Sequence, residues 1–395
     1  MFMEGEVMQQ VSSGEVVSIL GFFEDLEDPR STINRKHLVG DLIVICICGV
    51  LAGADGPKAI GAWAKANADW LRQHLALPNG IPSHDTIGRL LALLKPAAFQ
   101  SCFQNWIRCL RNGADQDGEA NTEQPVEEVI AIDGKALRSS HDHKNCLGSL
   151  FLVSAWSVQQ GISLGQLATE EKSNEITAIP ELIDNIDVTG ATVTIDAAGC
   201  QKNIAAKIID GGGDYVLSLK GNQGNLHQAV ENWIMAQMDN DFADVTVCTH
   251  EETVKGHGRV DRLTYYQFCV PDSLPGRTNW KGLRTIGVAI RMSQQGDRET
   301  SEVRYFISSL GLGVKRFARA IRGHWSIENT LHWCLDVTFR EDQSRLRNRH
   351  AADNMAWLKR FTISLLKQQK DKESIAMRRR MAGWNTDYLA QVLGL

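Results

Sequence analysis

Short runs of β-branched, apolar residues alternate with longer helical patterns along most of the chain. Val129–Ile132 is the clearest of these runs and predicts a buried strand that ends at Asp133, where a glycine follows. A second run, Ala191–Asp196, has the same form and also ends in an aspartate. An isolated Asp-Gly pair usually only begins a turn. Two strand-end carboxylates in one domain suggest a site, because a buried carboxylate needs a partner such as a metal ion.

Residues 129–370 predict a mixed α/β domain. In chain order, the expected elements after the first strand are strands at Leu150–Ser157 and Gly161–Thr169, a helix at Asn174–Ile186, the strand ending at Asp196, a helix at Cys200–Ile209 and a strand at Asp214–Leu219. This order resembles the ribonuclease-H-like mixed sheet, in which carboxylates of neighbouring strands meet at one edge. Alternating patterns over residues 244–310 predict a β-strand insertion, and helices return at Lys315–Leu335 and Asn354–Lys367.

Helical patterns predict an all-α N-terminal domain over residues 1–113. They cover Ser18–Leu26, Leu38–Gly53, Lys58–Leu75 and Ile81–Leu94, the last with Ser83 as a helix N-cap. Two short helices around the turn at Leu77–Ser83 could form a helix-turn-helix DNA reader, although helix pairs without that role are common. A polar, acidic stretch over residues 114–128 predicts a linker, and residues 371–395 predict a helical, basic C-terminal tail.

Composition is ordinary for a globular protein, with 43% hydrophobic and 23% charged residues. The most apolar run, Leu42–Ala54, is shorter than the roughly 20 residues that span a bilayer. No signal-peptide pattern is evident at the N-terminus, and the nine cysteines include no CxxC pair. We therefore expect a cytoplasmic protein without a membrane partner.

Charge is distributed unevenly along the chain. The net charge is −5, yet residues 314–395 carry 16 Lys and Arg against 8 Asp and Glu. Such asymmetry is typical of a localised surface that binds a polyanion. A solvated helical face explains the same basic segment equally well.

The candidate functional site is one in which carboxylate oxygens bind a divalent metal ion. Asp133, Asp196 and a helical glutamate, Glu328, suit Mg²⁺ or Mn²⁺, and two such ions can support phosphoryl transfer. A zinc site is the alternative, because His324 and His332 flank Glu328 at four-residue spacing on one helix face. Structural histidines fit that spacing as well. Aromatic and basic residues interleave in the insertion, as in a platform for bases or in ordinary strand faces.

Five ordered motifs resemble one family, the bacterial insertion-sequence transposases of the ISAs type, which include the H-repeat-associated proteins. The motifs are AIDGKALRSS (131–140), ATEEKSNEITAIPELID (168–184), TIDAAGCQKNIAAKIID (194–210), GGDYVLSLKGNQGNL (212–226) and GHWSIENTLHWCLDVTFREDQSR (323–345). The resemblance spans about residues 18–370. It implies a DDE transposase with a ribonuclease-H-like fold, a β-insertion and an N-terminal DNA-binding region.

The resemblance also implies a function and its residues. Asp133, Asp196 and Glu328 would be the catalytic, metal-binding triad of an enzyme using Mg²⁺ or Mn²⁺, with two ions. The enzyme would cut and join double-stranded DNA at the inverted-repeat ends of its element and in target DNA, acting as a homodimer. Weaker candidates for binding DNA phosphates are Lys220, Asn222, Arg259 and Arg322.

Two departures from the family pattern bear on DNA binding. The GHGRVDR run (256–262) is similar to an HGRxE-type signature with Asp261 in place of the glutamate. The Tyr, Arg and Lys positions that related elements carry around the glutamate are here Ile321, His324 and Leu335, so Arg322 or Lys315 could take over those contacts. A structure-selective nuclease on the same fold and a non-catalytic DNA-binding remnant stay as alternative functions.

Overall fold

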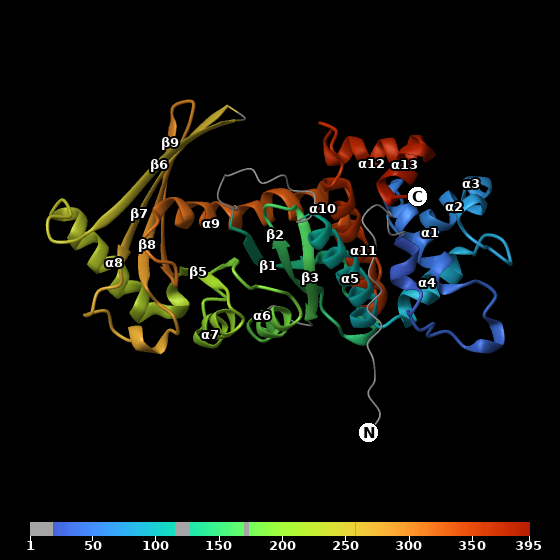
Figure 1. Ribbon diagram of the computed structural model, residues 1–395, viewed down its shortest axis with the longest axis horizontal. Coiled ribbons are helices and arrows are strands. Elements are labelled where there is room, and N and C mark those ends of the chain that lie inside the picture. Colours follow the sequence, from blue (N-terminus) through green and yellow to red (C-terminus); the bar gives the residue numbers. More distant parts are fainter. Residues whose placement is uncertain (1–18, 115–126, 170–173, 257) are drawn as a thin grey trace, which may run out of the picture.

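A nine-stranded mixed sheet runs through the centre of the computed structural model, which describes residues 19–114, 127–169, 174–256 and 258–395 (Figure 1). The strand order is β3-β2-β1-β4-β5-β9-β8-β7-β6. The strands are β1 (Val129–Leu137), β2 (Leu150–Ser157), β3 (Ile162–Thr169), β4 (Thr192–Ile195), β5 (Asp214–Leu219), β6 (Val247–Gly256), β7 (Arg259–Cys269), β8 (Thr285–Gln295) and β9 (Arg298–Ser308).

The first five strands form the ribonuclease-H-like part of the sheet. Strands β1, β4 and β5 pair in parallel, whereas β2 and β3 pair antiparallel to their neighbours. Parallel strands need both faces covered, and their continuous apolar runs agree with this. The predicted fold class is confirmed.

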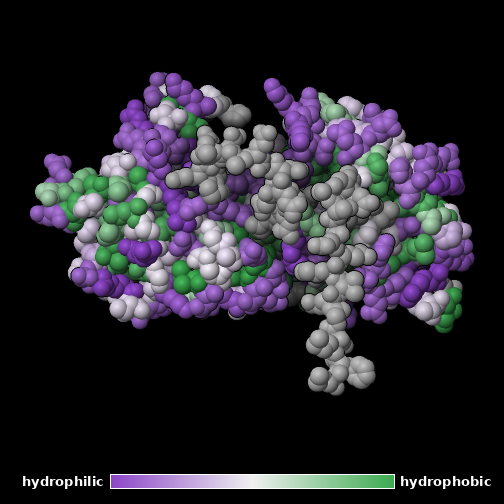
Figure 2. Space-filling model, viewed as in Figure 1, coloured by the Kyte–Doolittle hydropathy of each residue, from purple (hydrophilic) through white to green (hydrophobic). Residues whose placement is uncertain are grey.

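The predicted β-insertion continues the same sheet. Strand β9 pairs antiparallel with β5, so that Leu217 lies opposite Ile307, and β6–β9 form a meander beyond it. A helix that the sequence did not predict, α8 (Gly224–Asp239), packs against β8 and β9. The far ends of β6 and β9 project from the body, and Figure 2 shows hydrophilic residues over that projection.

Helices cover both faces of the central sheet. Helices α6 (Glu175–Asp184) and α7 (Lys202–Asp210) lie on one face. The other face carries α9 (Val314–Ser326), the π-helical segment η8 (Ile327–His332), α10 (Trp333–Val337) and α11 (Arg349–Lys367). The single helix predicted over 315–335 is therefore interrupted by a π-helical turn, and such turns are frequent at functional sites.

The N-terminal region is helical, as predicted. It comprises the short η1 (Ile19–Phe23) and the helices α1 (Val39–Leu51), α2 (Pro57–Ala66), α3 (Ala68–His74), α4 (His84–Leu93) and α5 (Pro96–Ala114). The Ser83 hydroxyl accepts from the Thr86 N–H, which confirms the predicted N-cap. The helix predicted over 58–75 is broken at Asn67, because the Asn67 side-chain amide donates to the Trp63 carbonyl at 2.9 Å and caps α2.

The C-terminal residues are helical, as predicted, and they pack on the rest of the fold. They form α12 (Ile375–Trp384) and α13 (Thr386–Leu393), which pack on α11, and α12 also contacts α1. Arg378 and Arg379 are each only 7% exposed. Arg379 donates to the Val50 carbonyl, pairs with Asp55 at 2.8 Å and stacks on a phenylalanine ring. Part of the basic excess is therefore internal and unable to meet a polyanion.

Most of the predicted acidic linker lies outside the described residues. Within them, every helix is too short or too polar to traverse a lipid bilayer.

Candidate active site

Asp133 and Asp196 lie side by side on neighbouring parallel strands. The register pairs Ile132 with Ile195, so the residues that follow them are adjacent. Strand β4 ends there, as predicted, but β1 does not. It continues to Leu137 because Asp133 and the residues after it pair with β2, with Asp133 opposite Ser154. The prediction that Asp133 ends its strand is wrong: it lies in mid-strand, level with the end of β4.

The loop after Asp196 is held by backbone and side-chain hydrogen bonds. One Asp196 carboxylate oxygen accepts from the N–H groups of Ala198 at 2.9 Å and Gly199 at 3.2 Å. The Asn222 side chain donates to the Ala197 carbonyl at 2.5 Å. Asn222 therefore fixes the loop that carries Asp196, while Lys220 follows β5 on the same edge of the sheet.

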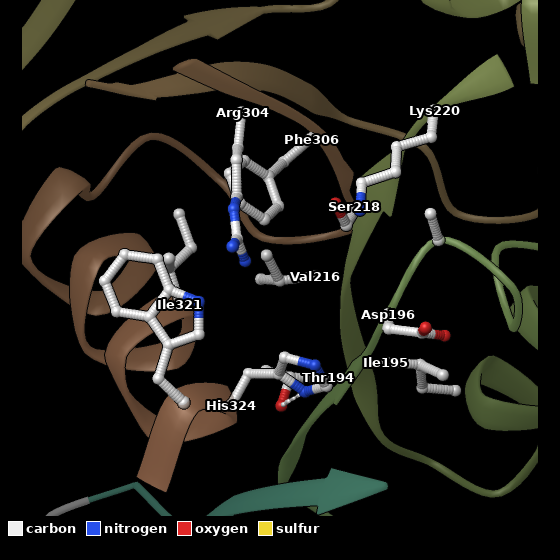
Figure 3. A pocket seen from close by; sticks show the side chains of 12 residues that line it. Thr194, Ile195, Asp196, Val216, Ser218, Lys220, Arg304, Phe306, Ile321 and His324 are labelled. Carbon is white, nitrogen blue, oxygen red and sulfur yellow. Dashed lines mark hydrogen bonds between the residues drawn. The ribbon is translucent and has the colours of Figure 1, made fainter. Parts of the chain in front are cut away.

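A small pocket opens beside Asp196 (Figure 3). Lys220 and Arg304 extend into it from the end of β5 and from β9, and His324 enters it from α9. The His324 ring lies 3.5 Å from the Thr194 hydroxyl. Two cationic side chains therefore line the pocket next to one of the candidate catalytic carboxylates.

Glu328 lies in η8, on a helix that runs alongside β1. Gly323 packs against Val129, where an added Cβ would come within 2.7 Å of the valine side chain. Further along, His332 Nδ1 is 3.6 Å from Asp133, and Asp336 pairs with Lys135 at 2.8 Å. The first of these contacts joins Val129 to Gly323, and the last joins Lys135 to Asp336. At about 3.3 Å per strand residue and about 1.5 Å per helix residue, the strand from 129 to 135 and the helix from 323 to 336 both span about 20 Å. This matched spacing holds Glu328 beside the two strands.

The two histidines that flank Glu328 contact different strands. His324 is next to Thr194 on β4, whereas His332 is next to Asp133 on β1. Burial lowers the pKa of His324 to about 4 and that of His332 to about 3, so both rings are neutral. Among the described residues, no three His, Cys, Asp or Glu side chains converge as a preformed metal-ligand set. Through their contacts with Thr194 and Asp133, the two histidines brace the helix between the strands.

Negative charge is concentrated at Asp133. Burial, followed by the charges of Asp196, Glu328 and Glu175, raises the pKa of Asp133 to about 7. Glu175 reaches this point from α6 on the other face of the sheet, where its carboxylate fills the space that a Cβ on Gly134 would need. Carboxylates brought together in this way repel one another unless a cation joins them. The hard oxygens of these carboxylates are the ligand type that suits Mg²⁺ or Mn²⁺, although in the described residues they do not converge into a preformed ligand set.

Comparison with known proteins identifies the family. The transposase DDE domain matches residues 124–366, and the associated N-terminal domain of such transposases, DDE_Tnp_1-associated, matches residues 20–107. The chain belongs to the DDE transposase family. This match and the relatives described next confirm the predicted resemblance to the H-repeat-associated transposases.

Relatives of this transposase cover nearly its whole length. It is 38% identical to the "H repeat-associated putative transposase YhhI" of Escherichia coli K12, over 96% of this chain and 98% of the relative. It is 37% identical to the "Putative transposase YncI" of Escherichia coli O157:H7, over 96% and 95%. A piggyBac transposase synaptic complex with hairpin DNA aligns over 95% of this chain and 76% of its own, but at 12% identity and a TM-score of 0.39, too low to assign anything.

A groove lined by four arginines adjoins Glu328 in this DDE transposase. Two of them, Arg259 and Arg322, were candidates from the sequence. The other two, Arg291 and Arg304, were missed by the sequence analysis. Arg304 lies opposite Ala289 on β8, two residues before Arg291, so both arginines are on the same face of the sheet. Asp261 holds Arg259 at 3.0 Å and Arg291 at 2.8 Å.

Arg304 joins this groove to the pocket at Asp196. It lines both, and its guanidinium lies 5.2 Å from the centre of the Trp325 ring, which lines both as well. Together with Arg322 of α9, the insertion thus presents an arginine-lined surface, called the cationic surface below, to the strands and the helix that carry the three candidate carboxylates. Within it, Arg304 pairs with Glu302 and Arg322 pairs with Glu252. All seven sequence candidates lie on this surface or at the adjoining edge of the sheet.

Proposed function

We propose that this chain is a Mg²⁺- or Mn²⁺-dependent DNA transposase that cuts DNA at the inverted-repeat ends of its element and joins the freed 3′-hydroxyl to target DNA. One observation carries the proposal: two neighbouring strands and one helix bring Asp133, Asp196 and Glu328 close enough for the charges of the latter two to raise the pKa of Asp133. Membership of the DDE transposase family supports it.

Each carboxylate has a distinct role in this proposal. Asp133 and Asp196 would hold the ions from adjacent strands, and Glu328 would complete the second site from the helix. When bound, such ions activate an attacking hydroxyl and stabilise the leaving oxygen of a phosphodiester. The rigid loop at Asp196 and the helix braced beside β1 keep the three oxygen donors in place during the reaction.

DNA is the proposed partner, and the cationic surface is where its backbone would lie. Lys220, Arg259, Arg304 and Arg322 can donate to phosphate oxygens, which would fix the DNA register without reading its sequence. Asn222 acts instead by supporting the Asp196 loop. Bringing two element ends together requires at least a homodimer, and we propose that the protein acts on the bacterial nucleoid in the cytoplasm.

A cleavage and strand-transfer assay tests the proposal. Labelled element-end DNA is incubated with the protein in Mg²⁺, Mn²⁺ or EDTA, beside Asp196→Asn and Glu328→Gln. We expect metal-dependent nicking at the element end that both variants lose. Binding without cleavage in any metal overturns the proposal and favours a DNA-binding remnant, whereas cutting of branched DNA without joining favours a nuclease.

Removing one arginine from the cationic surface should weaken DNA binding in a salt-dependent way. Arg304→Gln is expected to lower affinity and to reduce the slope of log affinity against log salt by about 0.9, the value for one lost phosphate contact. Arg298→Gln, at the exposed far end of the same strand, is the matched control and should leave the slope unchanged. Fluorescence anisotropy with element-end DNA in EDTA measures both, and equal slopes for the two variants would exclude Arg304 from the DNA contact.

A further inference from the structure

Lys135 occupies a buried position at the junction of β1 with the helix that carries Glu328. Its side chain is 9% exposed, and its ammonium lies 2.8 Å from Asp336, 3.2 Å from Asp342 and 3.4 Å from Glu341. Lysine offers three donors from one compact charge, which matches three converging carboxylates. The sequence gives no hint of this cluster, because its acidic members follow Lys135 by about two hundred residues.

The spacing of two contacts aligns β1 with this helix. Asp133 and Lys135 point to the same face because side chains alternate along a strand, and they are about 6.6 Å apart. His332 and Asp336 are one helical turn apart, which is about 6 Å. Asp133 therefore meets His332 while Lys135 meets Asp336, and a shift of either segment would break both contacts.

The acidic side of the cluster is itself anchored to the sheet. Glu341 accepts from the Arg360 guanidinium at 2.8 Å, and Arg360 also donates to the hydroxyl of Ser154, the residue opposite Asp133. The Ser139 hydroxyl donates to the Asp342 carbonyl at 2.6 Å. Lys135 is thus the one charge in this cluster that contacts both η9 (Glu341–Gln343) and the end of α10.

We propose that Lys135 is a positioning residue: its contact with Asp336 sets the register of the helix against β1, and so places Glu328 relative to Asp133. The inference rests on the proposed function, because it concerns the geometry of that metal site. It differs from a purely structural ion pair in one respect. Loss of the contact should disturb the joint site formed by Glu328 and Asp133 more than it disturbs folding or DNA binding.

Iron-directed self-cleavage measures this geometry independently of DNA chemistry. Fe²⁺ replaces Mg²⁺, and ascorbate with peroxide then generates hydroxyl radicals that cut the chain near the bound metal. In the wild type we expect cuts near both Asp133 and Glu328. Added Mg²⁺ should suppress these cuts by displacing Fe²⁺. If the wild type shows no cut that Mg²⁺ suppresses, the proposed metal site itself is wrong, and that result is distinguishable from failure of the Lys135 inference.

Lys135→Met is the main variant, with Asp336→Asn as the second, because there Lys135 keeps Glu341 and Asp342. For both variants we expect the affinity for element-end DNA in EDTA to stay within about twofold of the wild type. The rate constant of strand cleavage should fall about 100-fold, as for an ångström-scale misplacement of a reacting group. Iron-directed cutting near Glu328 should be lost relative to cutting near Asp133. Lys207→Met removes an ion-paired lysine on α7 and should change none of these.

Two results would overturn the inference. One is a folded Lys135→Met or Asp336→Asn protein that keeps both the wild-type cutting ratio and the wild-type rate. The other is an equal loss of cutting at the two positions, which would indicate general weakening of the site. If Lys135→Met does not fold, as a thermal melt would show, Asp336→Asn alone decides between these outcomes.

Discussion

Asparagine in place of Asp133 is expected to abolish strand cleavage and, at pH 8 without divalent cations, to raise the free energy of unfolding. Burial and then the neighbouring carboxylates raise the pKa of Asp133 from 3.8 to about 7. Above that pH the folded protein must carry an unfavourable charge that the amide lacks. The residue proposed to hold metal therefore makes the metal-free fold less stable.

The sign of the pH dependence follows from linkage. Between about pH 4 and pH 7 the folded protein holds a proton on Asp133 that the unfolded chain has released, so wild-type stability falls as pH rises through this window. Each unit of pKa corresponds to about 1.4 kcal/mol, and relaxation of the site reduces the total, so we expect a gain of about 2–4 kcal/mol for Asp133→Asn at pH 8. At pH 4 the difference should be close to zero.

Urea unfolding in EDTA at several pH values measures this difference. Asp69→Asn, which alters a fully solvated side chain, is the control and should change stability little at any pH. Added Mg²⁺ should stabilise the wild type and reduce the difference in the free energy of unfolding between it and Asp133→Asn, because an ion that binds only the folded state favours that state. Equal stability of the wild type and Asp133→Asn at pH 8 would show that the carboxylates do not repel one another as inferred.

Arg360→Met is expected to cost about 3–5 kcal/mol of folding stability, because it removes one partner of a buried ion pair. Arg360 is fully buried, and it binds Glu341 at 2.8 Å and the Ser154 hydroxyl at 3.1 Å. Burial would raise the pKa of Glu341, but the charges of Arg360, Lys135 and Lys359 hold it below its usual value. Without Arg360 the carboxylate loses its main partner in an apolar interior.

A second substitution tests that explanation. Adding Glu341→Gln to Arg360→Met should restore part of the loss, since the uncompensated charge is gone. Arg72→Met, which breaks an exposed ion pair with Asp69, is the control and should cost less than about 1 kcal/mol. Denaturant unfolding of the wild type, the two single variants Arg360→Met and Glu341→Gln, and the double variant completes a double-mutant cycle. A double variant no more stable than Arg360→Met would argue against charge burial as the cause.

Much of this fold follows from local patterns in the sequence. The strands around Asp133 and Asp196 are readable because β-branched runs report burial, and the Ser83 cap is readable because it acts within one turn. The mid-strand position of Asp133 is not, because it depends on β2, which pairs with β1 beyond the end of β4. Periodicity also gives no sign of the π-helical turn at Glu328.

Side chains whose partners are far away in the sequence were the hardest to interpret. The basic C-terminal tail was predicted without its partners, whereas the structure buries Arg379 against α1 and Arg378 against the end of α11. Arg291 and Arg304 looked like ordinary strand residues, since only the stacking of the insertion against α9 places them beside Glu328. The candidate carboxylates were singled out by their strand-end and helix positions and then by the family motifs, but spacing alone does not show that they meet.

The packing of the C-terminal helices also has a consequence for synthesis on the ribosome. The apolar helix α1 is covered by α11 and α12, and the Asn354 side chain donates to two carbonyls at the end of α4, those of Leu91 and Leu94. The N-terminal helices therefore lack part of their core until nearly the whole chain has been translated. A nascent chain released early would expose this apolar surface, which makes it a target for chaperones and proteases, so truncated copies should be degraded and should not compete for DNA.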